Sequence, residues 1–142
     1  MTLADDLRRW AKGMYGIEAA TELLLRAFDG KFATPGNPWI HTSVEVVGPG
    51  AVNAWIDFES IPDHSGALSG GERKFLLLAA SLATDVPVVL GDVVTGLDRQ
   101  NVELLLAAIA HAAGSHEHSG MTFHDDGTPK AFTHLTTLYR WP

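Results

Sequence analysis

The chain contains no cysteine among its 142 residues, and this absence removes several kinds of chemistry at once. Without a thiol the protein can form no disulfide, no zinc–thiolate site and no cysteine nucleophile. No apolar run approaches the ~18 residues that a membrane-spanning helix needs. The first six residues are acidic, whereas a secretory signal begins with basic residues. We therefore expect a soluble, cytoplasmic protein with no membrane partner.

Positive charge is also scarce. Ten Lys and Arg stand against 17 Asp and Glu, which gives a net charge of -7. The basic residues are scattered, and only Arg8-Arg9 and Arg73-Lys74 are adjacent pairs. Binding to a nucleic-acid backbone needs concentrated Lys and Arg, so we expect no nucleic-acid partner. With 46% apolar residues, the length suits a single domain spanning residues 1–142.

The first half of the chain alternates between helical and strand patterns. Apolar spacing predicts a pair of helices within residues 1–30, with Thr2 as the N-cap of the first helix and Gly13 near the break. Residues 29–38 hold two Gly and two Pro and are typical of a loop. Period-two alternation on both sides of Gly48-Pro49-Gly50 predicts a β-hairpin over residues 39–59.

The second half, residues 68–142, reads as alternating helices and strands. The spacing predicts a helix over 71–84, a buried parallel strand over 86–90 and a helix ending at Gly114. Two further strands are predicted near residues 121–124 and 135–141. The predicted fold class is therefore α/β: an N-terminal helix pair, a β-hairpin and a β-α-β lobe with right-handed crossovers.

The stretch Leu68–Arg73 is the most distinctive motif in the chain. A Ser-Gly-Gly step that opens a helix presents unpaired backbone N–H groups toward an anion such as phosphate. The stretch resembles the signature motif of ABC-type ATPases, including the heads of SMC-type chromosome proteins. Later features follow the same order as in that family: Asp92 after an apolar run, Leu97-Asp98 as in a D-loop, and His124 at a switch-histidine position.

This resemblance covers roughly residues 40–141 and implies the C-terminal half of an ATPase head. In that family the signature loop closes over a nucleotide that the other subunit of the dimer holds. The resemblance therefore implies a set of nucleotide-contacting residues that act in trans: Ser69, Gly70, Gly71, Glu72, Asp92, Asp98 and His124.

Two essential parts of an ATPase are missing from the sequence. A phosphate-binding loop reads G-x-x-x-x-G-K-S/T, but Gly30-Lys31 is followed by Phe32, and Leu25 stands where the first Gly belongs. Val93 occupies the position of the glutamate that orients the attacking water. We therefore expect no catalytic residue and no self-sufficient ATP hydrolysis. We expect the chain to bind ATP and Mg²⁺ only together with a partner that carries the missing loop.

Three functions remain open on this basis. The preferred one is a non-catalytic, degenerate ATPase-like domain that serves as an interaction or regulatory module, with a protein partner or as a homodimer. The second is a signature subunit that contacts ATP bound to its partner. The third is a small metal-dependent enzyme that uses the His- and Asp-rich segment 111–126.

Simpler structural roles compete with each of these assignments. Ser69 and Asp98 are good helix N-caps, and Asp92 suits a capping position after a strand. The weak candidates for metal ligands are His111, His116, His118 and His124. Because Gly114 interrupts the helix, His111 is not held one turn from a second histidine, and loop histidines are usually solvated. The sequence therefore predicts no metal site.

Overall fold

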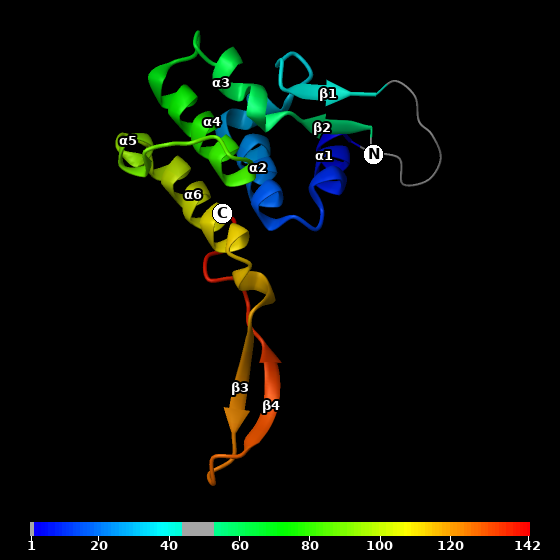
Figure 1. Cartoon of the computed structure of the whole chain (residues 1–142), viewed down its shortest axis with the longest axis vertical. Helices are drawn as coiled ribbons and strands as arrows, with labels where there is room; N and C mark the ends of the chain where they lie inside the picture. Colours follow the sequence, from blue (N-terminus) through cyan, green and yellow to red (C-terminus); the bar gives the residue numbers. More distant parts are fainter. Residues whose placement is uncertain (1, 44–52) are drawn as a thin grey trace.

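The computed structural model describes residues 2–43 and 53–142 (Figure 1). The described chain combines six α-helices with two small antiparallel sheets of two strands each, an arrangement compatible with the α/β class. The predicted turn at Gly48-Pro49-Gly50 lies outside the described residues. None of the helices in the described part is long and apolar enough to cross a lipid bilayer.

Both predicted N-terminal helices are confirmed, as α1 (Leu3–Ala11) and α2 (Tyr15–Arg26). Thr2 caps α1 reciprocally: its Oγ1 accepts the N–H of Asp5 at 3.1 Å, and the Asp5 carboxylate accepts the N–H of Thr2 at 3.0 Å. This is the capping box that satisfies the first N–H groups of a helix. Helix α2 ends at Arg26, where Ala27 is extended, and the 3₁₀ segment η1 (Ala27–Ala33) follows, kinked at Phe28, Asp29 and Gly30 by positive φ angles.

The first hairpin is confirmed within the described residues. Strand β1 (Ile40–Thr42) pairs antiparallel with β2 (Ala54–Ile56), and Ile40 lies opposite Ile56. Ala54 and Ile56 are buried while Trp55 between them is exposed, as the pleat of a half-buried strand requires. Two short elements follow, η2 (Phe58–Ser60) and α3 (Ile61–His64).

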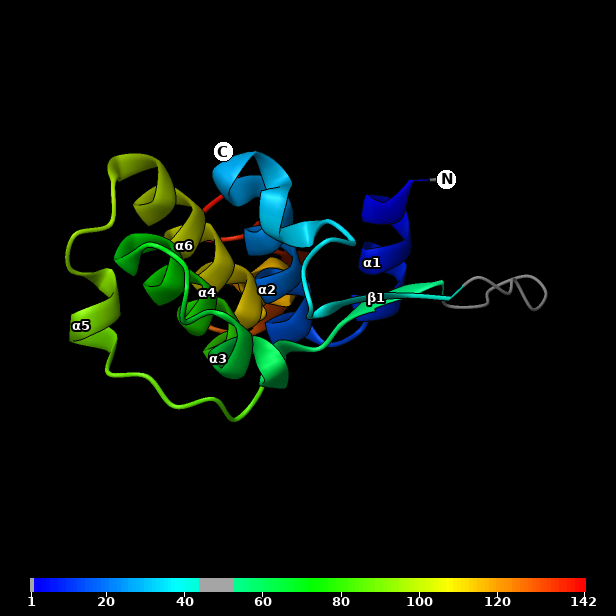
Figure 2. The same cartoon turned by 90° about the horizontal axis from the view of Figure 1, so that it is seen from above.

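The core lies between three helices. Helix α2 packs against both α4 (Gly70–Ala83) and α6 (Arg99–Ala112), and Figure 2 shows α2 between these two helices and α1 with β1. Apolar residues on the facing sides are fully buried, including Leu23, Phe75 and Ala108. Burial of such side chains is the main favourable term in folding, so this helical layer stabilises the molecule.

The predicted strand over residues 86–90 is wrong. In its place the chain runs without regular structure to Val89, and a short helix, α5, covers Leu90–Val94. Val89 and Leu90 are 67% and 55% exposed, and Pro87 lacks the N–H that a central strand must donate. Because α2, α4 and α6 fill the core, the segment finds no neighbouring strand, and the predicted parallel crossover is wrong with it.

The end of the chain forms a second hairpin instead of two separate strands. Gly114, with φ of +77°, ends α6 as predicted, and the 3₁₀ turn η3 (Ser115–Glu117) leads into β3 (Ser119–Phe123). Its partner is β4 (Pro129–His134). The predicted position of the last strand, near residues 135–141, is therefore wrong, because the strand that forms lies earlier in the chain. Figure 1 shows this hairpin projecting from the end of α6, away from the helical body.

Candidate functional site

The signature-like motif lies at the start of α4. Ser69, Gly70 and Gly71 are exposed, and Ser69 caps the helix by accepting the N–H of Glu72 at 3.3 Å. The Ser69 hydroxyl also donates to the Glu72 carboxylate at 2.9 Å, and that carboxylate forms an ion pair with Lys31. Hydrogen bonds from Lys31 and Ser69 lower the pKa of Glu72, so a carboxylate already faces this helix end. The capping role of Ser69 is confirmed, and contact with a nucleotide stays a prediction.

The other residues of the ATPase-like set are spread over the molecule. Asp98 caps α6 by accepting the N–H of Asn101 at 2.8 Å, which confirms its structural role. Asp92 is exposed in the first turn of α5, which packs against α4. The capping role predicted for Asp92 is wrong, because no strand directly precedes it in the described chain and Val89 is the N-cap of α5, without a side-chain hydrogen bond. His124 is exposed at the turn between β3 and β4, at the far end of the projecting hairpin (Figure 1). Within this chain the structure therefore does not gather His124 with Ser69.

The four candidate histidines separate into two groups. His111 and His116 lie together because η3 folds back beside α6, and their rings stack with centroids 4.1 Å apart at an interplanar angle of 7°. His118 and His124 are exposed and lie outside this cluster. The residue that completes the cluster is Glu18, whose Oε1 lies 2.7 Å from Nε2 of His111.

Glu18 was not anticipated from the sequence because it lies 93 positions before His111. It stands in the first turn of α2, and its second oxygen accepts the N–H of Gly13 at 2.8 Å. Burial raises the pKa of Glu18, but the hydrogen bonds from Gly13 and His111 outweigh burial and hold it below its usual range. The group is therefore an ionised carboxylate fixed against the His111 ring.

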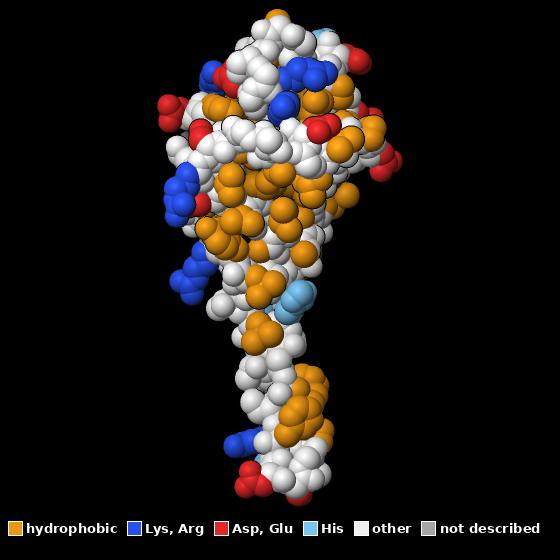
Figure 3. Space-filling view, turned by 90° about the vertical axis from the view of Figure 1, so that its left-hand side faces the viewer, with side chains coloured by type: hydrophobic (Ala, Val, Ile, Leu, Met, Phe, Trp, Pro, Cys, Tyr) orange, Lys and Arg blue, Asp and Glu red, His pale blue; other side chains and the backbone are white. Residues whose placement is uncertain are grey.

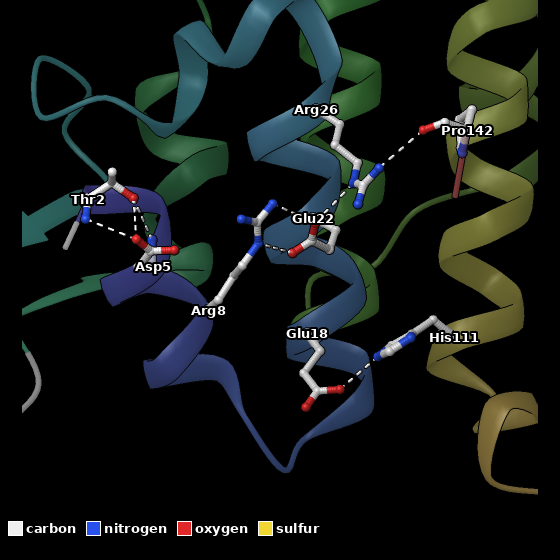
Figure 4. A network of polar contacts seen from close by, with 8 residues as sticks. All are labelled: Thr2, Asp5, Arg8, Glu18, Glu22, Arg26, His111 and Pro142. Atoms are coloured by element: carbon white, nitrogen blue, oxygen red, sulfur yellow. Dashed lines mark hydrogen bonds and ion pairs between the residues drawn. The ribbon is translucent and has the colours of Figure 1, made fainter. Parts of the chain in front are cut away.

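A polar cleft of about 480 Å³ opens beside this pair, between α1, α2, α6 and the end of the chain. Glu22 lies in it and accepts hydrogen bonds from two arginines: Arg8 through Nε at 2.7 Å and Nη2 at 3.1 Å, and Arg26 through Nε at 2.9 Å (Figure 4). The Arg26 guanidinium also donates to the carbonyl of Pro142 at 3.2 Å and lies 4.9 Å from the Trp141 ring centroid. This network ties α1, α2 and the final residues together.

A second feature is the apolar surface on the other side of α6. Figure 3 shows apolar side chains gathered across the helical body, and again on the hairpin below it, with most charged groups at the margins. On the body the exposed members, which we call the helical apolar patch, are Val89, Leu90, Leu106 and Ile109. Between α4, α5 and α6 the surface sinks into a shallow apolar groove lined by Leu78, Val88 and Leu105 among others.

The hairpin carries its own exposed apolar side chains. Phe132 is 77% exposed, Phe123 59% and Met121 37%, and Met121 lies directly across the strands from Phe132. We call these three residues the hairpin strip. Every residue of β4 is exposed, as are all of β3 except Gly120, so nothing in the described chain covers the hairpin. Neighbouring apolar side chains that are left exposed can mark a surface that binds a partner.

Comparisons with known proteins identify no relative. Neither the models of protein families, nor the curated proteins, nor the solved structures gave a match to this chain. What the chain does is therefore argued from its own geometry and chemistry.

Proposed function

We propose that this chain is a non-catalytic interaction module that forms a homodimer through the β3–β4 hairpin. The observation that carries the proposal is the isolation of this hairpin, which extends from α6 with both long edges unpaired among the described residues. A lone two-stranded hairpin is marginally stable in water, whereas three or more strands form a stable sheet. A partner that adds strands would satisfy the backbone groups of an edge and stabilise the hairpin.

The two edges of the hairpin are not equivalent. Strand β3 reads Ser119-Gly120-Met121-Thr122-Phe123 and contains no charged residue and no proline, so charge and proline do not protect its edge against strand pairing. The pairing of β3 with β4 is irregular only between Thr122 and Phe123. Strand β4 begins at Pro129 and carries Lys130, both of which hinder pairing along its edge. Strand β3 is therefore the edge at which a partner strand is added.

A second copy of the chain suits this edge. Two β3 strands that pair antiparallel about Met121 are related by a twofold axis, and every residue in the contact then meets an uncharged residue. The net charge of -7 therefore produces no like-charge contact within the strand pairing. The resulting four-stranded sheet joins the hairpin strips of both copies into one continuous apolar surface.

A charge at the centre of β3 is expected to weaken this dimer. In Met121→Lys, two ammonium groups oppose each other across the twofold axis, and we expect the dimer dissociation constant to rise by about fivefold, since like charges in directly opposed pairs destabilise a sheet by up to about 1 kcal/mol. Sedimentation velocity over a range of protein concentrations measures the change.

The matched control is Phe132→Lys, which places the same charge on the neighbouring strand, one strand away from the proposed interface. We expect it to leave the dissociation constant within about twofold of wild type, because the partner strand is not directly opposite. Equal effects of the two substitutions would contradict pairing through the β3 edge.

The proposal includes the ancestry of the chain: it descends from the second half of an ABC- or SMC-type ATPase head and has lost the catalytic parts. The order of Leu68–Arg73, Asp92 and Asp98 along the chain supports it. The absence of a strand between α4 and α6 in the described chain weighs against it.

The space beside Gly70 and Gly71, at the capped start of α4, favours a second candidate function, a signature subunit that caps ATP on a partner. A Cβ added at Gly70 or Gly71 meets no atom within 4 Å, so an approaching phosphate has room there. If this function holds, a pull-down with the chain recovers a protein that carries a phosphate-binding loop when ATP is present, but not when ATP is absent. The Ser69→Ala variant then recovers less of that protein. Tight ATP binding by the isolated chain, measured by isothermal titration, would contradict the idea of action in trans.

A further inference from the structure

Three potential metal ligands meet where α2, α6 and η3 come together. A carboxylate oxygen of Glu18 and imidazole nitrogens of His111 and His116 all lie within 4.8 Å of one another, and each of the three residues is half-buried. They come from three separate segments of the chain, so neither a run of acidic residues nor one flexible loop produces the cluster. The packing of α2 against α6 fixes the backbone positions of Glu18 and His111.

The polar groups of this cluster are incompletely satisfied by the protein. Nδ1 of His116 is buried and has no hydrogen-bond partner among the described residues. A buried polar atom without a partner is costly and rare in folded proteins. His111 stacks on one face of the His116 ring, and Tyr15 meets this ring in a T-shaped arrangement with the ring centroids 4.7 Å apart. A ligand to the nitrogen must approach in the plane of the ring, because the lone pair lies in that plane.

The donor set matches one class of ligand. Two neutral imidazoles and one carboxylate are the protein ligands of zinc sites that keep a fourth position open. Hard ions such as Mg²⁺ and Ca²⁺ prefer sites made of oxygen ligands, so a set with two nitrogens favours zinc and its neighbours.

Part of the support that holds metal ligands in place is already present. The Gly13 N–H binds the second oxygen of Glu18 at 2.8 Å and so fixes the orientation of the carboxylate. Such outer contacts position the ligands of metal sites and raise their affinity. Because the His111 and His116 rings are parallel, their in-plane lone pairs do not converge, and the His116 ring must turn out of the stack to meet a shared ion. An ion bound to Nε2 of His111 would also replace the hydrogen bond between this nitrogen and Glu18, and the proton of that bond would pass to solvent.

The open position of such a site would face the polar cleft. Glu18 and His111 both line it, together with Arg8, Lys12 and Arg26. A water molecule or a small anion entering the cleft could therefore reach an ion held by the three ligands. The exposed His118 and His124 contribute nothing to this arrangement.

We infer that Glu18, His111 and His116 form a binding site for one divalent cation of the zinc class, completed by a ligand from the cleft. The site is independent of the proposed dimer, since the hairpin strip contributes no ligand to it.

Titration of the chelator-treated full chain with zinc chloride tests the site, with isothermal calorimetry as the readout. We expect one ion per chain and a rise in melting temperature on addition of zinc, because binding to the folded state alone stabilises it. Glu18→Gln and His116→Ala should each weaken zinc binding at least about tenfold, a loss that corresponds to about 1.4 kcal/mol. The double variant His118→Ala/His124→Ala is the matched control and should bind as wild type does.

Cobalt substitution keeps the proposal testable even if a variant fails to fold. The wild-type chain with one equivalent of Co²⁺ should develop the visible absorption of a four-coordinate ion, and zinc should abolish it. The proposal is overturned if wild type gives neither binding heat nor this spectrum. It is equally overturned if loss of His118 and His124 weakens binding as much as loss of His116.

Discussion

Replacing Gly16 with alanine is expected to lower the free energy of unfolding by about 1–3 kcal/mol, the usual cost of overpacking a tight contact. Gly16 lies in α2 where this helix passes α4, and a Cβ at this position would stand 2.6 Å from the backbone oxygen of Leu82. That oxygen belongs to the backbone of α4, so no side-chain rotation can relieve the contact, and the two helices must move apart.

The matched control for this substitution is Gly71→Ala. Gly71 also lies near the start of a helix, but an added Cβ there meets nothing within 4 Å. Alanine has the higher helix propensity, so we expect Gly71→Ala to raise stability by up to about 1 kcal/mol. Urea unfolding of both variants measures the two effects, and a loss of stability in both, or in neither, would contradict the close packing of α2 on α4.

The second large effect is expected at Glu22. Glu22→Gln should lower the free energy of unfolding at neutral pH by about 1–2 kcal/mol, because hydrogen bonds to a charged acceptor become neutral ones. Glu22 joins Arg8 of α1 to Arg26 of α2, and its own side chain is 15% exposed. Glu103→Gln is the control, since Glu103 pairs at 4.0 Å with the almost fully exposed Arg99 and should change stability by less than about 0.5 kcal/mol.

The same carboxylate makes stability depend on pH. Burial raises the pKa of Glu22, but the hydrogen bonds from Arg8 and Arg26 outweigh burial, so its pKa in the folded state lies below the usual range. A carboxylate whose pKa is lower in the folded state than in the unfolded state stabilises the protein fully when the pH is above its pKa in the unfolded state, about 4.3 for Glu. That contribution is lost as the pH falls through the folded pKa.

Thermal unfolding from pH 7 to pH 3 should therefore show a smaller loss of stability for Glu22→Gln than for wild type. The neutral glutamine has no proton to take up on unfolding. Parallel curves for the two proteins would contradict the depressed pKa of Glu22. Glu18, whose pKa is also lowered, should leave a residual slope in both proteins.

Local signals in the sequence predicted the local parts of the structure. Thr2, Ser69 and Asp98 each cap a helix, because a cap depends only on residues three positions away. Gly114 ends α6 in the left-handed conformation that glycine favours. The second hairpin also had a local signal that the strand prediction overlooked: Asp126-Gly127, a typical turn pair, lies between β3 and β4.

Features that depend on distant contacts could not be read from the sequence. The apolar run at residues 86–90 fits a buried strand by composition, but short runs of this kind do not reveal whether a neighbouring strand exists. In the structure, helices α2, α4 and α6 pack together in the core, and residues 86–90 have no neighbouring strand among the described residues. The cluster of Glu18, His111 and His116 likewise exists only because α2 packs on α6, and no spacing in the sequence links Glu18 to the histidines.

The most direct test of the proposed function is the mass of the wild-type chain in solution. Sedimentation equilibrium at several protein concentrations should give twice the mass of one chain at high concentration, with dissociation on dilution. A mass of one chain at every concentration would contradict the proposal that the uncharged edge of β3 joins two copies.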